Sequence, residues 1–85
     1  MLTLLKIDLG ITVSAYDERL EALLETARQM IAREGITLTD SAEDTQLIVT
    51  YAAWLWRRRD SGAGMPRMLR YLINNRLFSE KARVI

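Results

Sequence analysis

The stretch from residue 14 to residue 35 reads SAYDERLEALLETARQMIAREG and carries the clearest pattern in the chain. Its apolar residues recur at helical spacing and form one stripe, made of Tyr16, Leu20, Leu23, Leu24, Ala27, Met30 and Ile31. Ser14 can cap the start, with Asp17 three residues on, and Gly35 supplies a left-handed stop. The pattern predicts an amphipathic helix over residues 15–34, whose solvated acidic face carries Glu18, Glu21 and Glu25.

The segments on either side predict three more helices, over residues 2–9, 42–59 and 66–78. Gly10 closes the first of them, and Asp40 or Ser41 caps the second. Pro66 suits the first position of the last helix, because its missing N–H would have no helical partner there. The pattern assigns no structure to the C-terminal tail, residues 79–85.

These elements predict an all-α fold, because no segment shows the alternating pattern of a strand. We expect a small bundle of three long helices plus a short N-terminal helix, in a single domain that spans residues 1–85. The opening MLTLLKIDLG has too few apolar residues for a signal peptide or a membrane span. A soluble, cytosolic protein without a membrane partner is therefore expected.

Composition argues against an enzyme. The chain has no cysteine and no histidine, so it lacks thiolate metal ligands, the commonest general base and the commonest metal ligand. The acidic pairs of residues 15–34 lie on a face with nothing apolar to raise a pKa, and they are typical of a solvated surface. The DSGAGMPR segment lacks the lysine and preceding strand of a phosphate-binding loop. We expect no catalytic residue, no bound metal and no cofactor.

Charge is divided unevenly along the chain. Residues 1–50 carry four bases and nine acids, giving −5, whereas residues 51–85 carry eight bases and two acids, giving +6. A chain polarised in this way can attract its own copies head to tail, or can present its basic end to an acidic partner.

The helix over residues 42–59 is apolar on two sides. One side is a normal core stripe with Leu47, Ile48, Tyr51, Trp54, Leu55 and the stem of Arg58. The opposite side carries Val49, Ala52, Ala53 and Trp56, again at helical spacing. A helix of this kind is either buried centrally or in contact with a second molecule, and the sequence leaves both readings open.

The helix over residues 66–78 also has a second side that is not simply polar, although this side is less apolar than that of residues 42–59. Its core stripe holds Met65, Leu69, Leu72, Ile73, Leu77 and the stem of Arg76. Its other side holds Arg67, Arg70, Tyr71, Asn74 and Phe78, a mixture of aromatic, arginine and amide side chains that is typical of a binding surface. The alternative is an idle surface on which long side chains lie over apolar neighbours.

Nucleic-acid binding is the competing function. The WRRR run of residues 56–59 offers cations beside an aromatic ring. However, consecutive residues step by about 100° around a helix, so Arg57, Arg58 and Arg59 fan out and cannot line one groove. A helix-turn-helix joins its helices by about three to four residues, whereas the longer DSGAGM intervenes here. A small helical DNA-binding regulatory protein that uses the basic C-terminal half is kept as the alternative.

Three blocks of the chain resemble a known family. They are LLKIDLGI followed by YDERLEALLETARQMI and EGI, then DTQLIVTYAAWLWRRR, then MPRMLRYLINNRLFSEK. Together they resemble the head–tail connector (adaptor) proteins of long-tailed bacteriophages and prophages, over nearly the whole chain. The most specific parts are LIVTYAAWLWRRR at residues 47–59 and MPRMLRYLINNRLF at residues 65–78.

The resemblance implies a small all-α virion protein without catalysis or cofactor. Its copies would form a closed ring of about a dozen subunits beneath the portal, and that ring would extend the DNA channel towards the tail. The partners implied are its own copies, the portal protein, and the next head-completion or tail protein, while DNA passes through the lumen without sequence-specific binding. The implied location is the head–tail junction of the virion, reached from the host bacterial cytoplasm during assembly.

A ring requires two different surfaces that meet around the circle. We expect the acidic face of Glu18, Glu21 and Glu25 to be one of them. The predicted subunit and partner interface comprises Val49, Ala52, Ala53, Trp56, Arg57, Arg59, Arg67, Arg70, Tyr71, Asn74 and Phe78.

Overall fold

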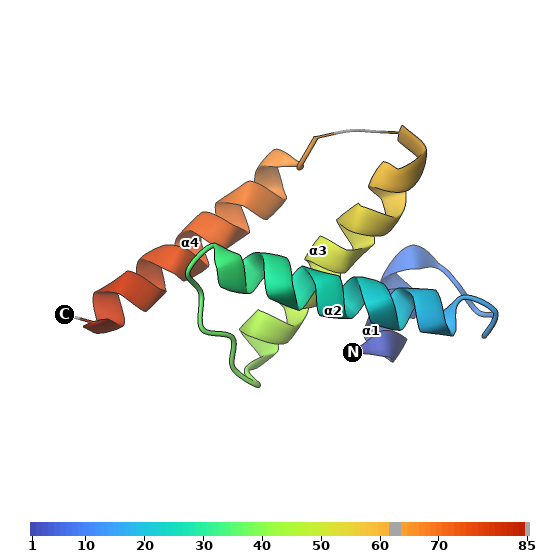
Figure 1. Cartoon of the computed structure of the whole chain (residues 1–85), viewed down its shortest axis with the longest axis horizontal. Coiled ribbons are helices and arrows are strands. Elements are labelled where there is room, and N and C mark those ends of the chain that lie inside the picture. The colour runs from blue at the N-terminus through green and yellow to red at the C-terminus, as the bar shows by residue number, and fades with distance from the viewer. Residues whose placement is uncertain (62–63, 85) are drawn as a thin grey trace.

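The computed structural model describes residues 1–61 and 64–84, and all of its regular structure is helical. The helices are α1 (Leu2–Leu9), α2 (Asp17–Arg33), α3 (Ala42–Ser61) and α4 (Arg67–Val84). No strand occurs in these residues, so the predicted all-α bundle of three long helices and one short one is confirmed. Figure 1 shows α2 crossing α3, with α1 near the start of α2 and α4 leading away towards the opposite end.

Helix α3 is the centre of the fold, because it packs against α1, α2 and α4. It contributes Leu47, Ile48 and Tyr51 to the core on one side and Val49, Ala52 and Ala53 on the other, all buried. The central-burial reading of its second apolar side is therefore confirmed for these last three residues. Their prediction as interface residues is wrong for this structure, because the chain's own helices already cover them.

The start of α2 differs from the prediction. The helix begins at Asp17 rather than residue 15, and its N-cap residue, Tyr16, makes no side-chain capping hydrogen bond. Ser14 therefore does not cap the helix with its hydroxyl. Asp17 instead pairs with the Lys6 ammonium group on α1 at 2.8 Å, so a contact between helices replaced the expected local one. The predicted stops are confirmed, since Gly10 and Gly35 both have positive φ, 72° and 102°.

The last helix is longer than predicted. Residues 79–84 of the unassigned tail continue α4 to Val84, whereas Ile85 lies outside the described residues. Glutamate, lysine, alanine and arginine in this segment all favour a helix. Glu80 also receives a hydrogen bond from Arg76 one turn earlier at 3.0 Å, which supports the extension.

The molecule is long and flat, with extents of 46 × 27 × 17 Å. Figure 1 shows the reason: the C-terminal half of α4 points to one end of the long axis, and the connection between α1 and α2 lies at the other. The two ends of the body are therefore built from opposite ends of the sequence.

Candidate functional site

The outward side of α4 carries the predicted residues of the C-terminal half. Arg67, Arg70, Tyr71, Asn74 and Phe78 are all exposed, with Tyr71 at 61% and Phe78 at 76% of their full accessibility. Sequence reasoning missed the exposure of Met68 and placed Leu72 in the core stripe, but both are exposed as well. We call Met68, Tyr71, Leu72 and Phe78 the α4 outer strip.

The opposite side of α4 attaches the helix to the rest of the chain. Leu69 and Ile73 are buried there, and Leu77 is partly buried against the core. Arg70 is exposed, but its guanidinium reaches back to the body of the protein and forms a salt bridge with Glu34 at the end of α2, with 3.2 Å between Nη1 and Oε2. Because this contact is partly exposed, it contributes at most about 1 kcal/mol.

A buried ion pair also holds α4 in place. The Arg76 Nε atom donates to Asp44 Oδ1 at 2.7 Å, and its Nη2 atom donates to Asp44 Oδ2 at 3.1 Å. The same Nη2 atom donates to the carbonyl oxygen of Thr37 at 2.8 Å, while Nη1 donates to Glu80. The side chains of Asp44 and Arg76 are 1% and 6% exposed. One guanidinium thus joins α4 to α3 and to the connection between α2 and α3.

Both oxygens of the Asp44 carboxylate accept hydrogen bonds. Its Oδ2 atom also accepts hydrogen bonds from the backbone N–H and the hydroxyl of Thr39, at 2.8 and 2.9 Å. The hydrogen bonds from Arg76 hold the pKa of Asp44 below its ordinary value, with burial opposing them and the Thr39 bonds adding to them. The hydrogen bond to Asp44 likewise raises the pKa of Arg76. Both groups are therefore charged across the physiological range, so the ion pair persists there.

Local sequence determines where Asp44 points. The hydroxyl of Ser41 accepts the backbone N–H of Asp44 at 3.1 Å and so caps α3, as predicted. Asp44 also lies at helical spacing from Leu47, Ile48 and Tyr51, on the core side of α3. The position of the Asp44 carboxylate on the apolar stripe of the helix was the sequence signal that could have indicated a buried acid. Sequence reasoning placed only the stem of Arg76 in the core and did not identify its partner.

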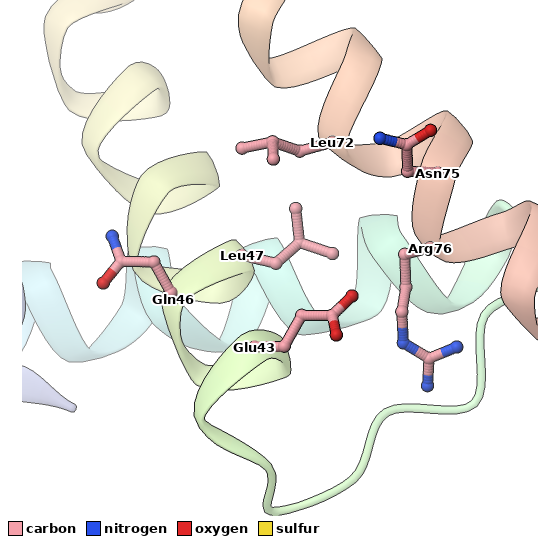
Figure 2. Close-up of a pocket in the computed structure, with 6 residues that line it drawn as sticks. All are labelled: Glu43, Gln46, Leu47, Leu72, Asn75 and Arg76. Carbon is pink, nitrogen blue, oxygen red and sulfur yellow. The ribbon is translucent and has the colours of Figure 1, made fainter.

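A pocket of about 290 Å³ lies beside the ion pair, between α3 and α4. It is lined by Glu43, Gln46, Leu47, Leu72, Asn75 and Arg76. Figure 2 shows the side chains of Leu47 and Leu72 directed into the space between the two helices. Leu72 belongs to the α4 outer strip as well, so the pocket and the strip form one continuous region of α4.

The arginine-rich end of α3 does not form a single surface. Arg57 reaches α1, where its Nη2 atom lies 3.2 Å from the carbonyl oxygen and 3.5 Å from the carboxylate of Asp8. Arg58 instead lies over the Trp54 ring, 5.2 Å from its centroid. The side chain of Arg59 lies outside the described residues. The predicted fanning is confirmed for Arg57 and Arg58, which engage different neighbours.

Trp56 is partly buried and packs against the core. Its ring meets that of Tyr16 edge to face, with 5.5 Å between centroids. This contact ties α3 to the residue that precedes α2. Much of the tryptophan surface that the sequence offered as an interface anchor is thus used within the chain.

The acidic face of α2 is exposed as predicted, with Glu18, Glu21 and Glu25 all accessible. Glu21 and Glu25 also line a second pocket beside Met1 and Leu2, where α1 begins. This face therefore belongs to the α1–α2 part of the fold, and the structure does not bring it together with the residues of α4.

Comparison of the chain with models of protein families, with curated protein sequences and with solved structures finds no match in any of the three. Within the described residues, no three carboxylate, histidine or cysteine side chains gather as a metal site would require. No helix in that part of the chain is both long enough and apolar enough to cross a bilayer.

Proposed function

We propose that the protein is a structural virion component of a bacteriophage or prophage, which forms an oligomeric ring that joins the portal and head to the tail. The proposal rests on the resemblance carried by residues 47–59 and 65–78 and on one observation, the uncovered α4 outer strip. It assigns the protein no catalysis and no cofactor.

The α4 outer strip supports self-association because it exposes large apolar side chains on one helix. Tyr71 and Phe78 alone leave most of their rings in water. Several large apolar side chains left exposed on one helix are typical of a protein interface. Aromatic residues with arginines beside them, here Arg67 and Arg70, are also the residue types that interfaces favour.

The partners in this proposal are copies of the same chain, the portal protein, and the next head-completion or tail protein. DNA passes through the lumen of the ring without being read. The pairing of Arg57 with Asp8 and of Arg70 with Glu34 is consistent with this, because those cations already have anionic partners within the chain.

Electron microscopy of the purified protein, alone and mixed with portal protein, tests the proposal. We expect closed rings in at least one of the two samples, and light scattering should give the matching mass. A protein that stays monomeric in both samples would refute the proposal.

The alternative, a DNA-binding regulatory protein, draws on the composition of α4. Residues 67–84 carry five bases and one acid, and the exposed cations include Arg67 and Lys81. Binding of this kind would show retardation of duplex DNA in a gel, lost on Arg67→Glu with Arg70→Glu. Its affinity would also fall steeply with salt, with a slope of about −0.9 per phosphate neutralised. Under the connector proposal neither effect is expected.

A further inference from the structure

The exposed large apolar side chains of the described residues fall into two groups. One group lies on α1 and in the connection to α2, and we call Leu4, Ile7, Val13 and Tyr16 the N-terminal apolar group. The other is the α4 outer strip. Apart from Met1, which adjoins the first group, only Met30 lies elsewhere. Apolar exposure is therefore concentrated in two segments far apart in the sequence.

The two groups lie towards opposite ends of the molecule. Figure 1 places α1 and the connection to α2 towards one end of the 46 Å axis, while α4 runs to the other end. One copy cannot cover its own strip with its own N-terminal group. The two surfaces can meet only between copies.

Charge favours contact between unlike ends. Residues 1–25 carry five acids and two bases, whereas residues 67–84 carry five bases and one acid. The exposed acids of the first segment include Glu18, Glu21 and Glu25. Two α4 outer strips packed together would bring their cations, such as Arg67 and Lys81, close to one another. Unlike ends attract, and like ends repel.

We propose that the N-terminal apolar group of a second copy covers the α4 outer strip. This inference rests on the proposed function for self-association, and it adds the identity of the two surfaces and their polarity. The contact is heterologous, so each added copy leaves one strip and one N-terminal group free. Such contacts produce a closed ring when the rotation between neighbours closes, and an open filament when it does not.

Two variants, each blocked at one end, test the polarity. Ile7→Asp damages the N-terminal group and Phe78→Asp damages the strip, and these side chains are 72% and 76% exposed, so neither change should disturb the core. Each variant alone should lose assembly, with self-association weakened at least about 100-fold, as when a central interface residue is lost. Mixed in equal amounts, they should form a one-to-one dimer that does not grow, because each retains the surface that the other lacks.

Size-exclusion chromatography with light scattering measures all of these states, with portal protein added where the wild-type chain requires it. Met30→Asp, outside both groups, is the matched control and should assemble like the wild type. Circular dichroism should show equal helix content in every variant. Phe78→Ala is a milder substitute should Phe78→Asp unfold.

The outcomes separate this inference from the proposed function. Rings that assemble normally from Ile7→Asp copies would overturn only the inference, because the strip would then have another partner. A mixture of the two variants that stays monomeric would also overturn it. A wild-type protein that remains monomeric with and without portal would overturn both proposals.

Discussion

Replacing Asp44 with alanine should destabilise the protein far more than replacing the acid beside it. The Asp44 carboxylate and the Arg76 guanidinium are almost completely buried and make two hydrogen bonds with each other. Without the carboxylate, the guanidinium stays buried with only Glu80 and the carbonyl oxygen of Thr37 as acceptors. The change therefore leaves a partly compensated charge in the interior.

The expected size follows from this geometry. Removing one partner of a buried pair typically lowers the free energy of unfolding by about 3–5 kcal/mol. Because Arg76 keeps two acceptors, we expect the lower end, about 3 kcal/mol. A chain of this length has a total stability of about 4–13 kcal/mol. With a urea m-value of about 1 kcal/mol/M, the unfolding midpoint should fall by about 3 M.

Urea titration followed by circular dichroism measures this midpoint. Glu43→Ala is the matched control, since Glu43 is the preceding residue in the first turn of α3 but is exposed. The control should lose less than about 1 kcal/mol. Combining Asp44→Leu with Arg76→Met should recover much of the loss, because a packed apolar pair leaves no charge buried. An Asp44→Ala midpoint no lower than that of Glu43→Ala would refute this account.

Three further outcomes are expected. The pKa of Asp44 is lowered in the folded state, so the stabilisation by its carboxylate is present above the ordinary pKa of 3.8 and is lost as the pH falls through the folded-state pKa. The urea midpoint of the wild type should therefore drop more steeply in acid than that of Asp44→Asn. Parallel curves for the two proteins would contradict this. Gly35→Ala should lower the free energy of unfolding by about 1–2 kcal/mol in urea titration, because φ is 102° there and a residue with a Cβ is strained in that conformation. An unchanged midpoint would count against that backbone. Trp56→Ala should lower the free energy of thermal unfolding of the monomer by about 2 kcal/mol, since the ring is partly buried. A variant that keeps its stability but no longer assembles would instead restore Trp56 as an interface anchor.

Helices that are defined by periodicity and stop signals were predictable from the sequence. Helix α1 has the expected bounds of residues 2–9, and Gly10 and Gly35 end their helices as left-handed residues. These features depend on neighbours within one turn. The start of α2 was mispredicted. The Asp17 N–H donates to the carbonyl oxygen of Ser14 at 3.1 Å and not to its hydroxyl, and the Asp17 carboxylate pairs with Lys6 of α1.

The candidate site was predictable where exposure follows from amphipathicity. Tyr71 and Phe78 lie on the outer side of α4, as their spacing indicated. The second side of α3 was different, because periodicity locates an apolar face without saying what covers it. In the structure, Val49, Ala52 and Ala53 are covered by the same chain. Asp44 and Arg76 are 32 positions apart in the sequence, so their pairing could not be predicted without knowing how α3 and α4 pack together.

The buried ion pair limits how far α4 can slide. Leu69, Ile73 and Leu77 are similar in size, so the apolar stripe alone would tolerate a shift of one helical turn, about 5.4 Å. Such a shift would bring Leu72 or Glu80 opposite the Asp44 carboxylate. With Leu72 there, the Asp44 carboxylate has no cationic partner; with Glu80 there, two carboxylates lie together. The ion pair therefore fixes the position of α4 along α3 in every copy of the chain. The α4 outer strip then has the same position relative to the rest of the molecule in each copy.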